Sequence, residues 1–288
     1  MISLLNKQNS SVIFRECKTT HGKLIGLASL NSPKTLNALS IEMIELMLKQ
    51  FSLWFSREEI VAVAIEGVGQ KSFCAGGDVV SLYHELVRLR KDKKNVDENN
   101  VLLKAIVDSS LANQFFSKEY ELDLLIHNTS KPVITLLDGY TMGGGIGLMA
   151  GASHRIATEN TVFAMPEISI GLYPDVGASW FLNQMPKGIG LFLGLTGGFF
   201  NAKDGMTINM VDHLIDSNES HEIMTLLQEL PWKEADIDNH KLLSKFFSRL
   251  PSLQVNKLSD NLAQHHTLFR KIASFDNLEQ SYHAIIEH

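Results

Sequence analysis

Two glycine-rich stretches of this 288-residue chain have residue types that could hold an anion. "YTMGGGIGLMAG", Tyr140 to Gly151, places three successive glycines between a strand pattern and a helix pattern, and "GQKSFCAGGDVV", Gly69 to Val80, places Ala75-Gly76-Gly77 before a helix opened by Asp78. First-turn N–H groups of a helix lack intrahelical partners and point outward, and glycine lets a ligand oxygen approach them. Close packing of a helix on a strand is the alternative explanation for the triple glycine.

The two turns together favour an oxyanion site, because one N–H from each can hold a single oxygen during acyl chemistry. A third stretch, "FAMPEISIGLYPDVGASWFL", supplies carboxylates. Glu167 and Asp175 are the only acidic residues among its twenty positions. Burial would raise their pKa and suit them to acid–base work, although a single buried carboxylate is more often a structural hydrogen-bond acceptor.

Other motifs with glycine, histidine or cysteine do not match. A dinucleotide fingerprint would need glycine at Leu148, no Gly-Lys-Ser/Thr triplet forms a Walker A loop, and "GASHR" and "GASWF" lack the second glycine of a nucleophile elbow. Neither His84-Glu85 nor His221-Glu222 is followed by histidine at the zincin spacing. Cys17 and Cys74 alone make neither a zinc site nor a disulfide framework. We therefore predict no metal and no resident cofactor.

The elements that must position these residues alternate between strand and helix patterns. "KLIGLASL", Lys23 to Leu30, and "IVAVAIEG", Ile60 to Gly67, are typical of buried strands. Between them, Ile41 to Phe55 has helical spacing, with Ser40 as its N-cap. This βαβ unit indicates an α/β architecture.

The same alternation continues toward the C-terminus. We expect a helix from about Val101 to His127, a buried strand in Pro132 to Gly139 and two short β segments in His154 to Glu167. From Ala202 onward the pattern is mainly helical. The sequence therefore predicts a core domain over residues 1–201 and a helical region over 202–288.

Charge and hydropathy exclude several classes of partner. A net charge of −6 and a pI near 6.0 argue against nucleic acid, and the charge run Arg88 to Asn100 is expected to be a solvated helix end and loop. No apolar run reaches the roughly 18 residues that span a bilayer. The first residues lack the features of a secretory signal or a mitochondrial presequence, so we expect a cytoplasmic protein without a membrane partner.

Four motifs carry a family resemblance over about residues 12 to 215: "NSPKTLNALSIEMI", "KSFCAGGD", "DGYTMGGGIGL" and "FAMPEISIGLYPDVG". Their order and spacing resemble the crotonase (enoyl-CoA hydratase/isomerase) superfamily, and the chain looks most like its 3-hydroxyisobutyryl-CoA hydrolases. The resemblance implies an α/β fold, a spiral of ββα turns followed by a helical C-terminal region. Members of that subgroup continue past the point matching "FDNLEQSYHAIIEH", which implies a shorter helical region here.

The resemblance also assigns the glycine turns. It places the oxyanion donors on the backbone N–H groups of Ala75 and Gly144. It places Glu119 at an acidic position of the substrate pocket, where an ordinary surface helix residue is the alternative. The implied CoA-binding surface consists of backbone groups around Lys34, Leu36, Gly76, Gly77 and Asp78.

Departures from the hydratase pattern favour hydrolysis. Hydratases carry a glutamate at the position of Gly147, whereas only the second glutamate, Glu167, is present here. Asp175 matches the hydrolase subgroup, since hydratases usually have glycine there. The resemblance thus implies hydrolysis of a short-chain 3-hydroxyacyl-CoA thioester, 3-hydroxyisobutyryl-CoA of valine catabolism, with Glu167 as general base or as nucleophile through an anhydride.

Two other functions remain open from the sequence. One is an enoyl-CoA hydratase or isomerase, and the other is a non-catalytic acyl-CoA-binding or RNA-binding member whose only basic patch would be Arg88 to Lys94. The expected partner is a small acyl-CoA, with CoA as part of the substrate, and a homo-oligomer is left open.

Overall fold

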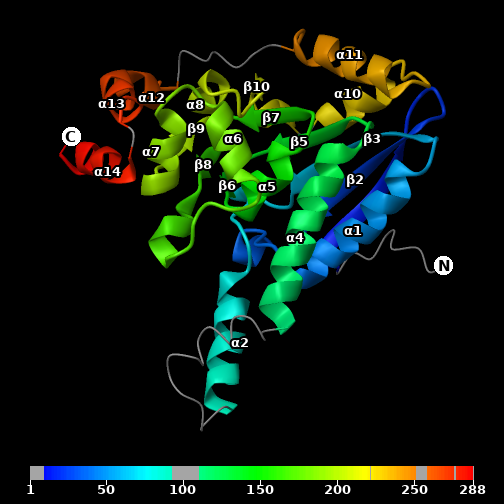
Figure 1. Cartoon of the computed structure of the whole chain (residues 1–288). Helices are drawn as coiled ribbons and strands as arrows, with labels where there is room; N and C mark the ends of the chain where they lie inside the picture. Colours follow the sequence, from blue (N-terminus) through cyan, green and yellow to red (C-terminus); the bar gives the residue numbers. More distant parts are fainter. Residues whose placement is uncertain (1–9, 93–109, 221, 251–257, 276, 288) are drawn as a thin grey trace.

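Two β-sheets form the centre of the computed structural model, which describes residues 10–92, 110–220, 222–250, 258–275 and 277–287 (Figure 1). Among these residues the larger sheet has the order β1-β2-β3-β5-β7-β10 and the smaller one β4-β6-β8-β9. The larger sheet contains β1 (Val12–Lys18), β2 (Leu24–Leu30), β3 (Ile60–Gly67), β5 (Val133–Leu137), β7 (His154–Thr158) and β10 (His213–Ile215). The smaller one contains β4 (Ser72–Cys74), β6 (Tyr140–Met142), β8 (Val162–Ala164) and β9 (Phe200–Asn201).

The chain passes repeatedly from one sheet to the other. Each of β3, β5 and β7 is followed by a strand of the smaller sheet and then by a helix. Neighbouring strands are parallel except in the β1–β2 and β8–β9 pairs. This is the spiral of ββα turns that the family resemblance implies, and that prediction is confirmed.

Helices surround the two sheets, and two single 3₁₀ turns lie in the loops. The turns are η1 (Pro33–Thr35) and η2 (Pro166–Ile170). The helices that precede the C-terminal region are α1 (Ile41–Phe55), α2 (Val79–Asp92), α4 (Ser110–Asn128), α5 (Gly144–Ala150), α6 (Ala178–Gln184) and α7 (Ile189–Thr196). Those that follow are α8 (Ala202–Thr207), α9 (Ser217–Ser220), α10 (Ile223–Glu229), α11 (Asp236–Phe247), α12 (Asn261–Gln264), α13 (His266–Ile272) and α14 (Leu278–Ile286).

The larger sheet is buried on both faces. In β3 every residue from Ile60 to Ile65 is buried, as expected for a parallel strand covered on both sides. One face packs on α1 and α4, which lie side by side, and the other packs on α10 and α11 (Figure 1). Alternate residues of a strand point to opposite faces, so Leu27 joins the α11 side and Ala28 the α1 side.

Several predicted helix boundaries can be compared with the structure. Ser40 caps α1 as predicted, since its side chain accepts a hydrogen bond from the Met43 N–H at 3.2 Å. The helix expected from about Val101 is described only from Ser110, because residues 101–109 lie outside the described part. The predicted charge run begins in the last turns of α2, which extends away from the sheets in Figure 1, and its residues 93–100 also lie outside.

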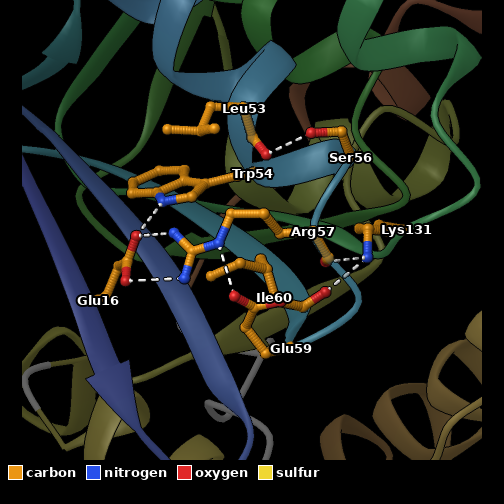
Figure 2. A network of polar contacts seen from close by, with 8 residues as sticks. All are labelled: Glu16, Leu53, Trp54, Ser56, Arg57, Glu59, Ile60 and Lys131. Carbon is orange, nitrogen blue, oxygen red and sulfur yellow. Dashed lines mark hydrogen bonds and ion pairs between the residues drawn. The ribbon is translucent and has the colours of Figure 1, made fainter. Parts of the chain in front are cut away.

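A network of polar contacts ties the end of α1 to the sheet (Figure 2). The Trp54 indole donates to Glu16 of β1 at 3.0 Å, and the Arg57 guanidinium makes two contacts with the same carboxylate. The buried Lys131 ammonium, just before β5, donates to the carbonyls of Arg57 and Ile60 at 2.9 and 2.7 Å. These bonds satisfy the carbonyl of Arg57, in the connection between α1 and β3, and the carbonyl of Ile60, at the start of β3.

The described residues beyond Asn201 are mainly helical but also contribute one strand to the larger sheet. β10 pairs in parallel with β7, and α12 and α13 pack on α8 and α7. The division at residue 201 stays a prediction. In the described part of the chain, no helix is both long enough and apolar enough to cross a membrane.

Candidate active site

The two glycine turns meet at one edge of the smaller sheet. Because β4 and β6 are parallel neighbours, the loops that follow them leave at the same edge. Gly76 has a φ of +107°, and a Cβ built on it would lie 3.4 Å from the Met142 carbonyl oxygen and 3.8 Å from the Gly144 nitrogen. The structure therefore places the Ala75-Gly76-Gly77 turn next to the triple-glycine turn. The sequence alone could only suggest this pairing, because acyl-transfer sites commonly use two such N–H donors.

The two predicted oxyanion donors differ in their present partners. Gly144 is the first residue of α5, so no carbonyl of that helix can accept its N–H. The Ala75 N–H donates to the Leu36 carbonyl at 3.0 Å, and the Leu39 N–H donates to the Gly76 carbonyl at 2.8 Å. A ligand oxygen would therefore reach the Ala75 donor only by sharing or replacing the Leu36 carbonyl.

Each glycine of the triple-glycine turn has its own steric reason. A Cβ on Gly143 would lie 2.7 Å from Oε1 of Glu167, and a Cβ on Gly144 would overlap Oε1 of Glu119. A Cβ on Gly145 would overlap the carbonyl oxygen of Cys74 in β4. Both explanations of the motif therefore apply, since Gly145 allows close packing on the strand while its two predecessors leave room for carboxyl groups.

Glu167 is a buried carboxyl at the start of η2. Its side chain is held in the first turn after Pro166, only 7% of the residue is exposed, and Oε2 has no hydrogen-bond partner among the described residues. Burial is the main cause that raises its pKa to about 7, and the negative charge of Asp175 acts in the same direction. Such a carboxyl exchanges its proton near neutral pH.

Glu119 faces the same turn from helix α4. The residue is 3% exposed, which rules out the alternative of an ordinary surface position. Burial, followed by the charges of Asp175 and Glu167, raises its pKa to about 8. At neutral pH this carboxyl is mostly protonated and can donate a hydrogen bond.

Asp175 is held from α4 by a residue that the sequence reasoning missed. The Tyr120 hydroxyl donates to Oδ2 of Asp175 at 2.6 Å, and burial and this bond raise the pKa of the tyrosine. Asp175 itself is only partly buried, so the expectation of a buried carboxyl holds for Glu167 alone. The next residue, Val176, has a φ of +43°, a strained value for a β-branched residue.

A fourth carboxyl, Asp123, was also missed. Both of its oxygens are buried without a hydrogen-bond partner among the described residues, and burial raises its pKa well above the ordinary value. It lies one helical turn after Glu119, and residues four apart share one face of a helix. The spacing of four residues between the acidic ends of "EYELD" could have indicated from the sequence that Asp123 lies beside Glu119.

The predicted CoA-binding surface adjoins the glycine turns. Lys34 and Leu36 line a pocket of about 370 Å³ together with Lys71, which the sequence reasoning did not single out. Asp78 has a structural role as well, because its carboxylate accepts bonds from the Ser81 N–H and hydroxyl at 3.1 and 2.6 Å and so caps α2. Gly77 leaves room for the Phe115 ring.

The described residues contain no group of three or more His, Cys, Asp or Glu side chains placed to hold a metal ion.

Known proteins resemble this chain in sequence and in fold. A 3-hydroxyisobutyryl-CoA hydrolase, mitochondrial, from Xenopus tropicalis is 39% identical over 231 residues, covering 78% of this chain and 53% of that protein. A small ribosomal subunit protein mS47 from Neurospora crassa is 38% identical over 70% of this chain and 36% of its own length. The crystal structure of a carnitinyl-CoA dehydratase from Mycobacterium thermoresistibile has a TM-score of 0.76 and 27% identity, over 97% of this chain and 71% of the other.

These relatives limit two of the predictions. The chain spans about half the length of the hydrolase it matches. That hydrolase is named as a mitochondrial protein, so it gives no support to the expectation that this chain is cytoplasmic, which stays a prediction. The family model for enoyl-CoA hydratase/isomerase matches residues 25–288, and the chain therefore belongs to the enoyl-CoA hydratase/isomerase family.

Proposed function

We propose that this protein hydrolyses a short-chain 3-hydroxyacyl-CoA thioester, with 3-hydroxyisobutyryl-CoA as its substrate. The observation that carries the proposal is the Glu167 carboxyl, which is buried beside the N-terminus of α5 and has a pKa of about 7. A general base works best with a pKa near the operating pH. The relatives named 3-hydroxyisobutyryl-CoA hydrolase support the same reaction.

In the proposed mechanism the thioester oxygen sits against the Gly144 N–H, and the Ala75 N–H turns to it from Leu36. Ionised Glu167 takes a proton from water as the water oxygen bonds to the thioester carbon. The carbon–sulfur bond then breaks, and the thiolate of CoA leaves and is protonated, which yields the free acid and CoA. The alternative route, in which a Glu167 oxygen attacks first and water opens the anhydride, uses the same groups.

The remaining polar groups would bind the two ends of the substrate. Asp175, oriented by Tyr120, would accept the substrate 3-hydroxyl, and protonated Glu119 would donate a hydrogen bond from α4. The ammonium groups of Lys34 and Lys71, both lining the pocket beside the Ala75 turn, would attract the phosphates of CoA.

Hydration of an enoyl-CoA is the second candidate, because a specific observation bears on it. The Gly147 position lacks the hydratase glutamate, but a Cβ there would lie only 2.7 Å from Oδ2 of Asp123. A second carboxyl is therefore present near that position, although it comes from α4. A relative of this chain is named as a ribosomal protein, so a non-catalytic role is a third possible outcome of the test.

The test is release of free thiol from 3-hydroxyisobutyryl-CoA, measured beside hydration of crotonyl-CoA with the same protein. We expect thiol release without comparable hydration. Hydration at a rate that rivals hydrolysis would favour the hydratase instead, and the absence of both activities with retained acyl-CoA binding would favour a non-catalytic role. Glu167→Gln should lose the thiol release, whereas Glu121→Gln, an exposed change on helix α4, is the matched control and should keep it.

A further inference from the structure

A pocket of about 410 Å³ adjoins the candidate active site and shares Tyr120 with it, the residue that orients Asp175 in the mechanism above. It lies between α4, α5 and the start of α6, and its walls include Leu124, Gly151, Val176, Trp180 and Phe181. Pockets of this size and apolar character commonly hold small ligands. A water-sized group takes about 30 Å³, so a four-carbon acyl group would fill on the order of a third of it.

The register of α4 against α5 shows where this pocket begins. Glu119 lies against Gly144, Asp123 against Gly147, and the next turn, at His127, lies against Gly151. Residues of the second and third levels line the pocket, whereas neither Glu119 nor Gly144 of the first level does, and Tyr120 reaches the pocket from beside Glu119. It therefore extends away from the thioester position, and Asp123 stands at its inner end.

Asp123 is wedged at this boundary. A Cβ built on Gly147 would lie 2.7 Å from both Oδ2 of Asp123 and Cβ of Val176, so both side chains pack against this glycine. Both carboxyl oxygens are buried without partners among the described residues. A methylene chain that passed this point would have to lie against an unpaired polar group, which is unfavourable.

We propose that Asp123 and Val176 form a polar gate that keeps long acyl chains out of the adjoining pocket and so limits the enzyme to short acyl-CoA thioesters. The inference rests on the proposed function, because it places the thioester at Gly144. The gate makes Asp123 a specificity-determining residue, and removing its carboxyl opens the apolar pocket to medium-chain acyl groups.

The experiment compares octanoyl-CoA with butyryl-CoA. Asp123→Ala is expected to raise the octanoyl-to-butyryl ratio of kcat/KM at least tenfold, since each newly buried methylene adds roughly a fourfold gain. Asp123→Asn keeps the size and polarity of the side chain and should keep the wild-type ratio. Val176→Ala opens the gap from the other side and serves where Asp123→Ala folds poorly.

Binding separates failure of this inference from failure of the proposed function. The dissociation constants of both esters are measured by calorimetry in the Glu167→Gln background, where turnover is expected to be about 10²–10⁴ lower. An octanoyl-to-butyryl affinity ratio that rises in the Asp123→Ala protein supports the gate even when no ester is hydrolysed. Unchanged ratios in both the Asp123→Ala and Val176→Ala proteins would overturn it, and so would a rise in Asp123→Asn equal to that in Asp123→Ala.

Discussion

Glu167 exchanges its proton near pH 7 because burial and the negative charge of Asp175 both favour the neutral acid. As a general base it must be ionised. The kcat/KM for hydrolysis should therefore rise with pH through about 7, and it should fall again above about 8, where Glu119 loses the proton with which it would bind the substrate. A pH profile that stays flat from 5 to 9 would contradict this assignment.

Replacement of the same residue tests its chemical role. Glu167→Gln keeps the shape of the side chain but removes the base, so we predict that turnover falls by about 10²–10⁴ while acyl-CoA affinity changes little. Turnover is measured by thiol release and affinity by calorimetry. A loss smaller than about tenfold would mean that another group activates the water.

Asp175 should recognise the 3-hydroxyl of the substrate. A carboxylate that accepts a buried hydroxyl disfavours an analogue without it, because the acceptor is then desolvated without a partner. Wild type should prefer 3-hydroxyisobutyryl-CoA over isobutyryl-CoA, and Asp175→Ala should reduce that preference. The measurement is kcat/KM for both esters with both proteins, and Tyr120→Phe should show a weaker form of the same effect because it removes the 2.6 Å bond that orients Asp175. Equal losses on the two esters would assign Asp175 to catalysis or folding alone.

At the scale of elements, helix α4 carries more of the candidate site than the sequence indicated. This helix contributes Glu119, Tyr120 and Asp123 to the site, but the family resemblance pointed only to Glu119. The glycine turns were predictable because few other functions require so many small residues after a strand. The role of Asp123 was not, because its burial depends on contacts with Gly147 and Val176 from distant parts of the chain.

The polar network at the end of α1 also connects elements, and removing one of its side chains should lower the stability of the fold. Lys131→Met removes the ammonium that donates to the carbonyls of Arg57 and Ile60 and leaves both without that partner. Since hydrogen bonds to charged groups contribute about 1.5–3 kcal/mol, we expect the free energy of unfolding to fall by roughly 2–3 kcal/mol in urea denaturation.

A matched change on the surface provides the control. The Lys241 side chain is 73% exposed and pairs with Asp238 at 3.5 Å, so Lys241→Met should change the free energy of unfolding by less than about 0.5 kcal/mol. Equal effects of the two substitutions would show that the buried ammonium contributes nothing special.

At the scale of the whole molecule, the two-sheet spiral places loops from distant segments at one edge. Strand and helix patterns predicted the βαβ start and the buried strands, because hydrophobic periodicity is a local property. They could not predict that Ala75 donates to Leu36, since that bond depends on the path of the chain between η1 and α1. They also could not place β10, whose three residues join the larger sheet within a mainly helical region.

The gathering of carboxyl groups at that edge makes the stability of the molecule depend on pH. In the unfolded chain Glu119 releases its proton near its ordinary pKa of 4.5, whereas the folded protein holds the proton until about pH 8. Between these values the folded state binds more protons, so this residue's contribution to stability is full below about pH 4.5 and is lost as pH rises toward 8.

Glu119→Gln removes the titration, and its thermal midpoint relative to wild type should therefore increase steadily from pH 5 to pH 8. Glu121→Gln, an exposed change on the same helix, should run parallel to wild type. A constant difference between the Glu119→Gln and wild-type midpoints across that range would show that the buried carboxyl ionises alike in the folded and unfolded states.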